Sequence, residues 1–291
     1  MKDYRGGIIM TDKIEKIGKK SIIQHGDHNK RIYLIKLDPQ DVGVIIPQLN
    51  ALARDQSYSK IFCKVPAWAA PVFNSDGFIM EAFIPHFYCG TENVCFMSKF
   101  LNSDRLLGME VDQLIAFSSL LLEYKSTDLE GTAVAHTDES PVLRLHEELA
   151  EEISKLYDQV FKSYPFPITD PAYIRQTMQK NIRYYGVKER GRLIALSSAE
   201  MDPESRNVEM TDFATLPAAR GKKLSLKLLE SMEKEMKEAG MITLYTISRL
   251  NSFPMNKTFL NRGYSYSGTL INNTNIAGNI ESMNVLYKHL N

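Results

Sequence analysis

Residues 208–227, VEMTDFATLPAARGKKLSLK, constrain the fold of this 291-residue chain more than any other segment. A strand predicted at 207–215 leads through Pro217 into an Arg-Gly-Lys-Lys-Leu-Ser turn, which opens a long helix. The helix is expected to end at Gly240, because glycine suits the left-handed position after a helix. Apolar residues recur along one stripe of it, at Leu224, Leu228, Met232 and Met236. This spacing predicts a helix with one buried face.

The turn at 220–225 is suited to bind a phosphate group. Backbone N–H groups at a helix N-terminus have no partner inside the helix and lie at the positive end of its dipole. Arg220, Lys222 and Lys223 add positive charge at the same point. A pyrophosphate is therefore the ligand that this turn favours.

The rest of the C-terminal half predicts strands alternating with helices. We expect strands at 142–146, 183–188, 192–201, 241–247, 264–270 and 281–288. Helices are expected at 147–161, after Thr169-Asp170-Pro171, and near 253–261. The order from residue 142 is β-α-α-β-β-β-α-β-α-β-β.

The N-terminal half has a similar but shorter alternation. It predicts strands at 31–37, 60–65, 78–88 and 93–100, and helices at 39–52 and 67–74. A hydrophilic stretch at 124–141 with little apolar periodicity separates the halves. We therefore predict an N-terminal α/β domain at 1–125, a linker at 126–141 and a C-terminal domain at 142–291.

A short internal repeat relates the two halves. Phe73-x-x-x-Gly77-Phe78 and Phe259-x-x-x-Gly263-Tyr264 share the pattern Phe-x-x-x-Gly-aromatic. Each copy is expected between a strand-helix pair and a strand pair. We infer that the N-terminal half is a partial unit related in structure to the C-terminal half, with chance similarity as the alternative.

Composition argues against several classes of function. The 35 basic residues balance 35 acidic ones, so no bulk field favours nucleic acid or an anionic membrane. The apolar stretches are too short to span a bilayer, and the N-terminus is charged where a signal peptide needs apolar residues. The 3 cysteines, an odd number, fit a reducing compartment, and we expect a cytoplasmic protein. Cysteines and histidines lack the spacing of a metal site, so we expect no metal.

The strand, turn and helix at 208–227 resemble the acyl-CoA element of the GNAT superfamily of N-acetyltransferases, whose signature is Gln/Arg-x-x-Gly-x-Gly/Ala. Arg220 matches its first position, whereas Lys223 and Ser225 stand where small residues are usual. The resemblance implies an α/β (α+β) GNAT fold, a mixed and mostly antiparallel sheet flanked by helices, with a partial GNAT-like unit at the N-terminus. It also implies acetyl-CoA as cosubstrate. The implied contacts are Phe213, Ala214, Thr215 and Leu216 along the pantetheine arm, and Gly221, Lys222, Lys223, Leu224 and Ser225 around the pyrophosphate.

A second family element follows the next strand. Asn251 and Asn256 precede Phe259, Gly263 and Tyr264, as asparagine precedes a tyrosine and Gly-Phe in many GNAT chains. The resemblance implies that Asn251, Asn256 and Phe259 lie at the cofactor. A phenyl ring at Phe259 cannot donate a proton, so Tyr245, Tyr264, Tyr266 or water remains as donor to the departing thiolate.

The catalytic base should be a carboxylate near the strand that precedes the turn, because an amine must lose a proton before it attacks a thioester. Glu209 and Asp212 both lie on this strand at opposite parity, so a regular strand would present only one of them to the cleft. We favour Glu209, since some GNAT enzymes carry their base at this position. An ordinary hydrogen-bonded or solvent-facing carboxylate is the alternative for each.

Longer stretches of the chain resemble the β-lysine Nε-acetyltransferases within this superfamily. They are IEKIGKKSIIQHGDHNKRIYLIKL, EMTDFATLP and MNKTFLNRGY. This resemblance implies transfer of acetyl to the distal amine of L-β-lysine, which makes the compatible solute Nε-acetyl-β-lysine for osmoadaptation. The substrate carboxylate needs a cationic partner, and we expect Arg249, with Arg183 and Arg175 as further candidates.

Three alternatives stay open at this point. Another GNAT activity would acetylate a different small amine, such as a polyamine, an aminoglycoside or an amino acid. A non-catalytic acyl-CoA sensor is suggested by the departures at Lys223, Ser225 and Phe259. The N-terminal half would, in a third interpretation, serve a homodimer through an unpaired sheet edge.

Overall fold

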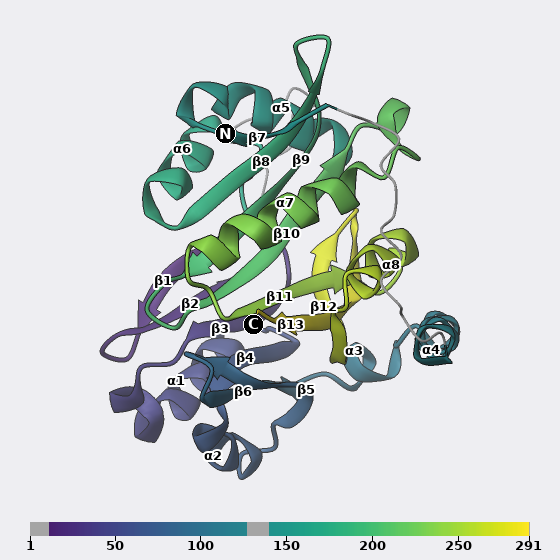
Figure 1. Ribbon diagram of the computed structural model, residues 1–291. Coiled ribbons are helices and arrows are strands. Elements are labelled where there is room, and N and C mark those ends of the chain that lie inside the picture. The colour runs from purple at the N-terminus through teal and green to yellow at the C-terminus, as the bar shows by residue number, and fades with distance from the viewer. Residues whose placement is uncertain (1–11, 127–139, 291) are drawn as a thin grey trace.

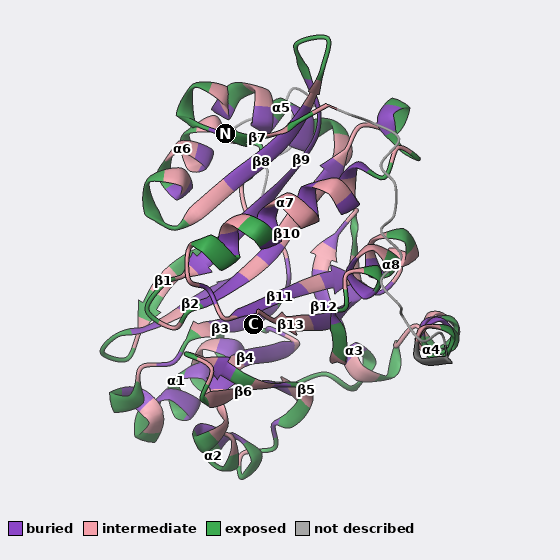
Figure 2. Cartoon of the chain, viewed as in Figure 1, coloured by how far each residue is buried: buried purple, intermediate pink, exposed green. Residues whose placement is uncertain are grey.

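Strands from both halves of the chain form one continuous sheet. The computed structural model describes residues 12–126 and 140–290, and Figure 1 shows their arrangement. The sheet has 13 strands in the order β1-β2-β3-β4-β6-β5-β12-β13-β11-β10-β9-β8-β7. Figure 2 shows that the strands are largely buried, while the outward faces of the helices are exposed. The chain therefore has an α+β architecture, as expected.

The C-terminal half contains the elements predicted for it, in the predicted order. Its strands are β7 (Val142–Leu145), β8 (Ile182–Glu189), β9 (Arg192–Asp202), β10 (Asn207–Thr215), β11 (Thr243–Arg249), β12 (Ser265–Ile276) and β13 (Asn279–His289). Its α-helices are α5 (Ala150–Val160), α6 (Pro171–Lys180), α7 (Leu224–Glu238) and α8 (Phe253–Asn261). Asp170 caps α6 by accepting a hydrogen bond from Ala172 N.

Successive residues of a strand point to opposite faces of the sheet, and helices cover both faces of this half. Tyr185 packs in a cluster with the apolar stripe of α7, which includes Leu228 and Met232. Its neighbour Tyr184 packs instead with Ile153 and other residues of α5 and α6. The predicted buried stripe of α7 is confirmed, and this packing fixes the turn that precedes α7 against the end of β10.

The N-terminal half repeats the strand connections of the C-terminal half. Its elements are β1 (Lys13–Ile17), β2 (Ser21–Gly26), β3 (Arg31–Lys36), α1 (Val42–Asp55), β4 (Lys60–Pro66), α2 (Ala70–Asn74), β5 (Ile79–Tyr88), β6 (Glu92–Phe100), α3 (Ser103–Leu107) and α4 (Val111–Ser126). Strand β3 runs parallel to β4, which pairs antiparallel with β6, and β6 with β5. In the same way β10 runs parallel to β11, which pairs with β13, and β13 with β12.

The two copies of the Phe-x-x-x-Gly-aromatic pattern have the same local geometry. In each, the backbone N–H of the final aromatic residue donates to the backbone carbonyl of the first phenylalanine. Phe78 donates to Phe73 and Tyr264 to Phe259, both at 3.2 Å. The rings of each pair meet edge to face, with centroids 5.2 and 5.0 Å apart. Both glycines have positive φ, which glycine adopts without strain. This shared geometry supports our proposal that the halves are related units; the domain bounds themselves stay a proposal.

The halves meet where β5 of one lies beside β12 of the other. Gly268 pairs with Ala82, and Ser267 exchanges hydrogen bonds with the backbone of Phe83. An apolar cluster crosses this junction, with Phe62 and Phe96 from one half and Tyr245 and Val285 from the other. The β5 edge of the N-terminal half is thus covered by the same chain. The homodimer stays a prediction, and β5 is not the open edge on which it was based.

Four elements were not predicted from the sequence: β1, β2, α3 and α4. Strand β1 has the sequence KIEKI, in which charged residues outnumber apolar ones, and its first two residues are exposed. Helix α4 contains residues 124–126, which were assigned to the start of the hydrophilic stretch. Its Phe117 ring packs on Tyr266, at 5.3 Å between centroids. The predicted linker residues 127–139 lie outside the described part of the chain.

Candidate active site

A cleft of about 1600 Å³ lies between the two halves. It is lined by strands β3 and β4 of the N-terminal half and by β9, β10, β11, β12 and the start of α7 from the C-terminal half. The predicted site residues that line it are Glu209, Asp212, Phe213, Thr215, Arg220, Gly221, Lys223, Leu224, Ser225, Arg249 and Phe259. Those outside its lining are Ala214, Leu216, Lys222, Asn251, Asn256, Tyr264, Arg183 and Arg175.

The cleft opens where two parallel strands separate. Strands β10 and β11 pair only from Asn207 with Thr243 to Glu209 with Tyr245. Beyond this point, Thr211, Asp212, Phe213 and Thr215 of β10 line the cleft, as do residues 246–249 of β11. Backbone groups along such a split lack a neighbouring strand and suit an extended, hydrogen-bonding ligand.

A β-bulge brings both predicted carboxylates into the cleft. The register of β10 against β9 shifts between Thr211 and Ala214, and Asp212 within it has a φ of 56°. A bulge reverses the alternation of side chains along a strand. Glu209 and Asp212 therefore both line the cleft, although their spacing would place them on opposite faces of a regular strand.

Glu209 lies directly opposite a second glutamate. It pairs across the ladder with Glu200 of β9, which also lines the cleft. Glu200 is exposed and Glu209 is half-buried, and both line the cleft, whose walls limit the water around them. This burial, together with the charge of Glu200, raises the pKa of Glu209 to about 8. Burial likewise raises the pKa of Glu200, while the charge of Lys64 opposes the shift.

Tyr245 and Lys64 stand next to these carboxylates. The Lys64 ammonium donates to the Tyr245 hydroxyl at 3.1 Å. Burial and the charge of Glu209 hold the pKa of Tyr245 well above its usual value, so its hydroxyl keeps its proton at neutral pH. Of the three tyrosines considered as proton donors, Tyr245 is the one that lines the cleft.

Asp212 is held in a network of hydroxyl groups. Its carboxylate accepts hydrogen bonds from Tyr164, Ser198 and Thr211. Burial raises the pKa of Asp212, and these three donors act in the opposite direction by stabilising the charged form. Because three hydroxyl groups donate to its oxygens, Asp212 is better suited to carry a fixed negative charge at the acidic end of the cleft than to act as a base.

The basic turn presents a helix N-terminus to the cleft. Lys223 precedes α7 in the left-handed region, with φ 57° and ψ 26°, and no side chain caps the helix start. Arg220 and Lys223 are exposed and line the cleft, whereas Lys222 pairs with Glu189 at 2.6 Å outside it. The first-turn N–H groups and the two cleft cations form a binding surface for a phosphate group.

The aromatic residues of the second family element form a wall behind the split strands. Phe259 is fully buried and packs edge to face with Phe213 at 5.5 Å and with Tyr264 at 5.0 Å between centroids. The Tyr264 ring lies under the Lys288 ammonium. Burial, and after it the charge of Glu233, hold the pKa of the Tyr264 hydroxyl well above its usual value. Tyr264 thus faces α7 and not the cleft, and Tyr266 bonds to Thr269 outside it.

The two asparagines maintain the loop between β11 and α8. Asn256 is fully buried; its amide donates to the carbonyls of Arg249 and Ser252 and accepts from the Ser248 hydroxyl at 2.8 Å. The Asn251 amide donates to Glu110 at 2.5 Å. Neither side chain lines the cleft, so the geometry supports a role in positioning the loop, and their contact with a cofactor stays a prediction.

The three arginines expected at the substrate carboxylate are all paired with acids. Arg249 lines the cleft but forms two hydrogen bonds with Glu281, at 2.7 and 2.8 Å. Arg183 pairs with Glu235 at 2.9 Å and Arg175 with Glu151 at 3.1 Å, both outside the cleft. Their role as substrate ligands stays a prediction, and the geometry supports it least for Arg183 and Arg175.

Sequence reasoning missed the contribution of the N-terminal half. Strand β3 presents Arg31 and Tyr33 to the cleft, and β4 presents Phe62 and Lys64, at the period of two that a strand imposes. Charged residues within the apolar runs RIYLIK and KIFCKV were the available signal. They do not reveal which surface faces them, because that depends on how the halves pack.

Residues 12–126 and 140–290 contain neither a candidate metal site nor a candidate membrane span. No group of three or more histidine, cysteine, aspartate or glutamate residues in these ranges could hold a metal ion. Over the same ranges, no helix has the length and apolar character needed to cross a membrane.

Comparison with known proteins gives a consistent set of relatives. Residues 148–264 match the family described as "Acetyltransferase (GNAT) family". A β-lysine N(6)-acetyltransferase of Methanococcus maripaludis is 42% identical over 269 residues, which cover 92% of this chain and 96% of that protein. N-acetyltransferase YodP of Bacillus subtilis is 32% identical over 287 residues, covering 97% and 100%. A β-lysine N(6)-acetyltransferase of Methanosarcina mazei is 39% identical over 136 residues, covering 47% and 50%.

Proposed function

This chain belongs to the GNAT family of acetyltransferases, and we propose that it transfers acetyl from acetyl-CoA to the distal amino group of L-β-lysine. The observation that carries this proposal is the similarity, over nearly the whole of both chains, to the β-lysine N(6)-acetyltransferase of Methanococcus maripaludis. That similarity includes the N-terminal half, which supplies one wall of the cleft. The site geometry supports an amine acceptor because its carboxylates gather at one end of the cleft.

The cleft fits acetyl-CoA, which GNAT enzymes use as acetyl donor. The separation of β10 and β11 would receive the pantetheine arm, beside Phe213 and Thr215. The N-terminus of α7, with Arg220 and Lys223, would hold the pyrophosphate. When bound, acetyl-CoA supplies the thioester from which the acetyl group is transferred.

Glu209 is the group that we assign as base. It stands at the point where β10 and β11 separate, so it borders the place where a thioester in the split would end. Its carboxylate takes a proton from the acceptor ammonium, which frees the nitrogen lone pair to form the N–C bond. As the C–S bond breaks, Tyr245 is positioned to give a proton to the thiolate, since its hydroxyl is protonated and faces the cleft.

The acidic end of the cleft matches the ammonium group of an amine acceptor. Glu200 and Glu209 face each other across the ladder, and Asp212 lies beside them on the bulge. After burial, the charge of Glu200 raises the pKa of Glu209, and the charge of Asp212 adds to the raised pKa of both glutamates. An arriving cation relieves that repulsion. An uncharged acceptor would leave the negative charge of these carboxylates without a cationic partner.

The test is an acceptor panel. The protein is incubated with acetyl-CoA and, separately, L-β-lysine, L-lysine, spermidine and an aminoglycoside, and free thiol is followed. We expect release with β-lysine at a kcat/KM at least tenfold above the other amines. Preference for another amine would show that β-lysine is not the acceptor and would leave the family assignment unchanged. Binding of acetyl-CoA without release on any amine would favour the acyl-CoA sensor.

The biological role follows from the product. We propose that Nε-acetyl-β-lysine accumulates as a compatible solute and that the enzyme works in the cytoplasm. Cells lacking this chain should then fail to accumulate the acetylated product at high salt, as measured by NMR of cell extracts. An unchanged pool would contradict this role.

A further inference from the structure

An acceptor that carries a carboxylate needs a cationic partner in the cleft, since a buried unpaired charge is costly. Arg249 lines the cleft, but Glu281, itself 8% exposed, already holds it by two hydrogen bonds. The Lys64 ammonium faces the acidic end, where its charge acts on Glu200 and Glu209. One further cation lines the cleft from the N-terminal half, and that is Arg31 of β3.

Arg31 is buried with one edge of its guanidinium group unused. It is 4% exposed, and Nη1 donates to the carbonyl of Asn273 and to the Thr274 hydroxyl, the latter at 3.0 Å. These are its hydrogen bonds within the described residues, and its buried Nε has no partner there. The edge formed by Nε and Nη2 is one that binds a carboxylate through two parallel hydrogen bonds.

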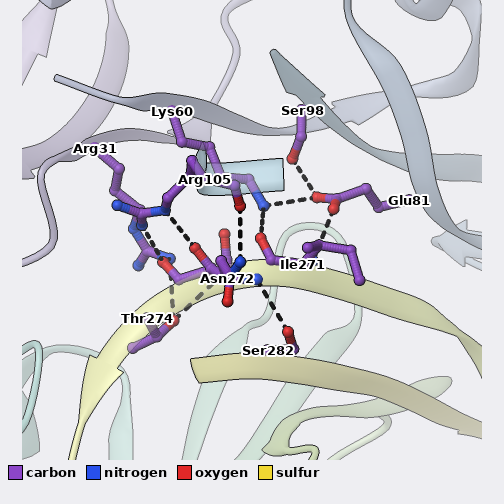
Figure 3. Close-up of polar contacts among 10 residues, drawn as sticks. Arg31, Lys60, Glu81, Ser98, Arg105, Ile271, Asn272, Thr274 and Ser282 are labelled. Atoms are coloured by element: carbon purple, nitrogen blue, oxygen red, sulfur yellow. Dashed lines mark hydrogen bonds and ion pairs between the residues drawn. The ribbon is translucent and has the colours of Figure 1, made fainter. Parts of the chain in front are cut away.

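The surroundings of Arg31 carry an excess of positive charge. Figure 3 shows Arg31, Lys60 and Arg105 converging on strand β12, where they donate to successive backbone carbonyls from Ile271 to Asn273. Glu81 pairs with Lys60 at 2.9 Å. Burial lowers the pKa of Arg105 to about 10, and the charge of Arg31 adds to this shift, so the two cations repel each other.

Asp12 offsets one of these charges without bonding to Arg31, so three cations face the two carboxylates Glu81 and Asp12. It lines the same end of the cleft, and its charge acts on Arg31. Its carboxylate, however, accepts hydrogen bonds from the His28 N–H and from the Asn29 side chain. Burial lowers the pKa of Arg31 to about 10, so the guanidinium stays charged at neutral pH.

Arg31 and the carboxylates stand at two ends of one site. Tyr33, two residues along β3 on the same face, feels the charges of Glu209 and Glu200 as well as that of Arg31. The guanidinium also lies 5.6 Å from the centre of the Tyr33 ring and 5.7 Å from that of Phe62. These aromatic rings separate the cationic end from the acidic end and give the space between them an apolar wall.

We propose that the Nε–Nη2 edge of Arg31 binds the carboxylate of the acceptor, so that the N-terminal half selects an amino acid over a plain amine. This assignment rests on the proposed acetylation of an amine in the cleft. The acceptor lies with its carboxylate on Arg31 and its distal ammonium group toward Glu200, Glu209 and Asp212. Arg31 is then a specificity residue, and β12 holds it in place through Nη1.

The test compares acceptors that differ only in the carboxylate. Wild-type protein is assayed with L-β-lysine and with the diamine in which hydrogen replaces its carboxylate. We expect a kcat/KM about 100-fold lower for the diamine, the order of effect of losing one partner of a buried charge pair. Arg31→Met should lower kcat/KM for β-lysine by a similar factor and leave the diamine unchanged. Arg105→Met is the matched control, because Arg105 belongs to the same cluster but lies outside the cleft lining.

Each outcome separates this inference from the proposed function. Equal use of both acceptors by the wild-type protein would overturn the role of Arg31 and leave acetylation standing. An equal loss on both acceptors in Arg31→Met would also overturn it, since that indicates a structural role. If the variant does not fold, the wild-type comparison decides alone. If β-lysine is not acetylated but L-lysine is, the proposed acceptor fails, and L-lysine against cadaverine then tests Arg31 in the same way.

Discussion

Glu209 and Glu200 show how one pair of side chains sets the working pH of a site. They face each other across β10 and β9. Burial raises the pKa of both, and the charge of Glu200 adds to the shift of Glu209, whose pKa rises to about 8. A base with this pKa takes up a proton readily near neutral pH, but below about pH 8 it is increasingly protonated and cannot act.

We predict that kcat/KM for the acceptor rises with pH through about 8 and that Glu209→Gln lowers it at least 100-fold and removes this inflection. Glu200→Gln should keep the inflection but move it to lower pH, because the charge that raises the pKa of Glu209 is gone. Profiles of kcat/KM against pH for the wild-type protein and the two variants measure these effects.

Stability measurements serve as the control for these variants. The pKa of Glu209 is raised in the folded protein, so its ionisation costs stability increasingly from about pH 4.5 up to about 8. Glu209→Gln should therefore unfold at a temperature no lower than wild type at pH 8. A Glu209→Gln protein with wild-type activity and an unchanged profile would remove Glu209 from the role of base.

The element that most defines the cofactor end is the start of α7. Lys223 takes a left-handed backbone conformation there, which costs a residue with a Cβ about 1–2 kcal/mol relative to glycine. The family signature commonly has glycine at this position. Lysine in this conformation lines the cleft with its charge, beside helix N–H groups that no side chain caps.

We expect Lys223→Ala to raise KM for acetyl-CoA about fivefold, the effect of losing roughly 1 kcal/mol of charge interaction at a helix N-terminus. The loss should shrink as salt screens the charge, while kcat stays within about twofold. Lys234→Ala, an exposed lysine on the same helix, is the control. Equal KM values for the two variants would show that Lys223 does not contact the phosphates.

At the scale of the whole molecule, the two halves make a close backbone contact at Gly268. A Cβ atom at Gly268 would lie 2.0 Å from the backbone carbonyl oxygen of Glu81 on β5. Neither backbone can withdraw without moving a strand. The cleft depends on this joint, because β3 and β4 belong to one half and β10 and β11 to the other.

We predict that Gly268→Ala lowers the free energy of unfolding by about 3 kcal/mol, as overpacking against backbone does. It should also raise KM for the acceptor more than KM for acetyl-CoA, since the acceptor is expected to touch both halves. Urea denaturation and steady-state kinetics measure the two effects. Gly43→Ala, in helix α1 where the space around the added Cβ is open, should not lower the free energy of unfolding or change either KM. Similar losses in both variants would contradict this account of the joint.

The sequence by itself determined the order of elements from β7 to β13, because apolar periodicity, Asp170 and Gly240 mark them locally. It also indicated the basic turn at α7 and the two carboxylates of β10. Only the tertiary structure decided that Glu209 and Asp212 share one cleft, since that requires a bulge, and that Glu200 faces Glu209, since that requires strand register. It alone placed Arg31 at the cleft beside an unrelated part of the sequence. Local pattern determines which face of an element is buried, whereas the packing of the halves across β5 and β12 determines what that face meets.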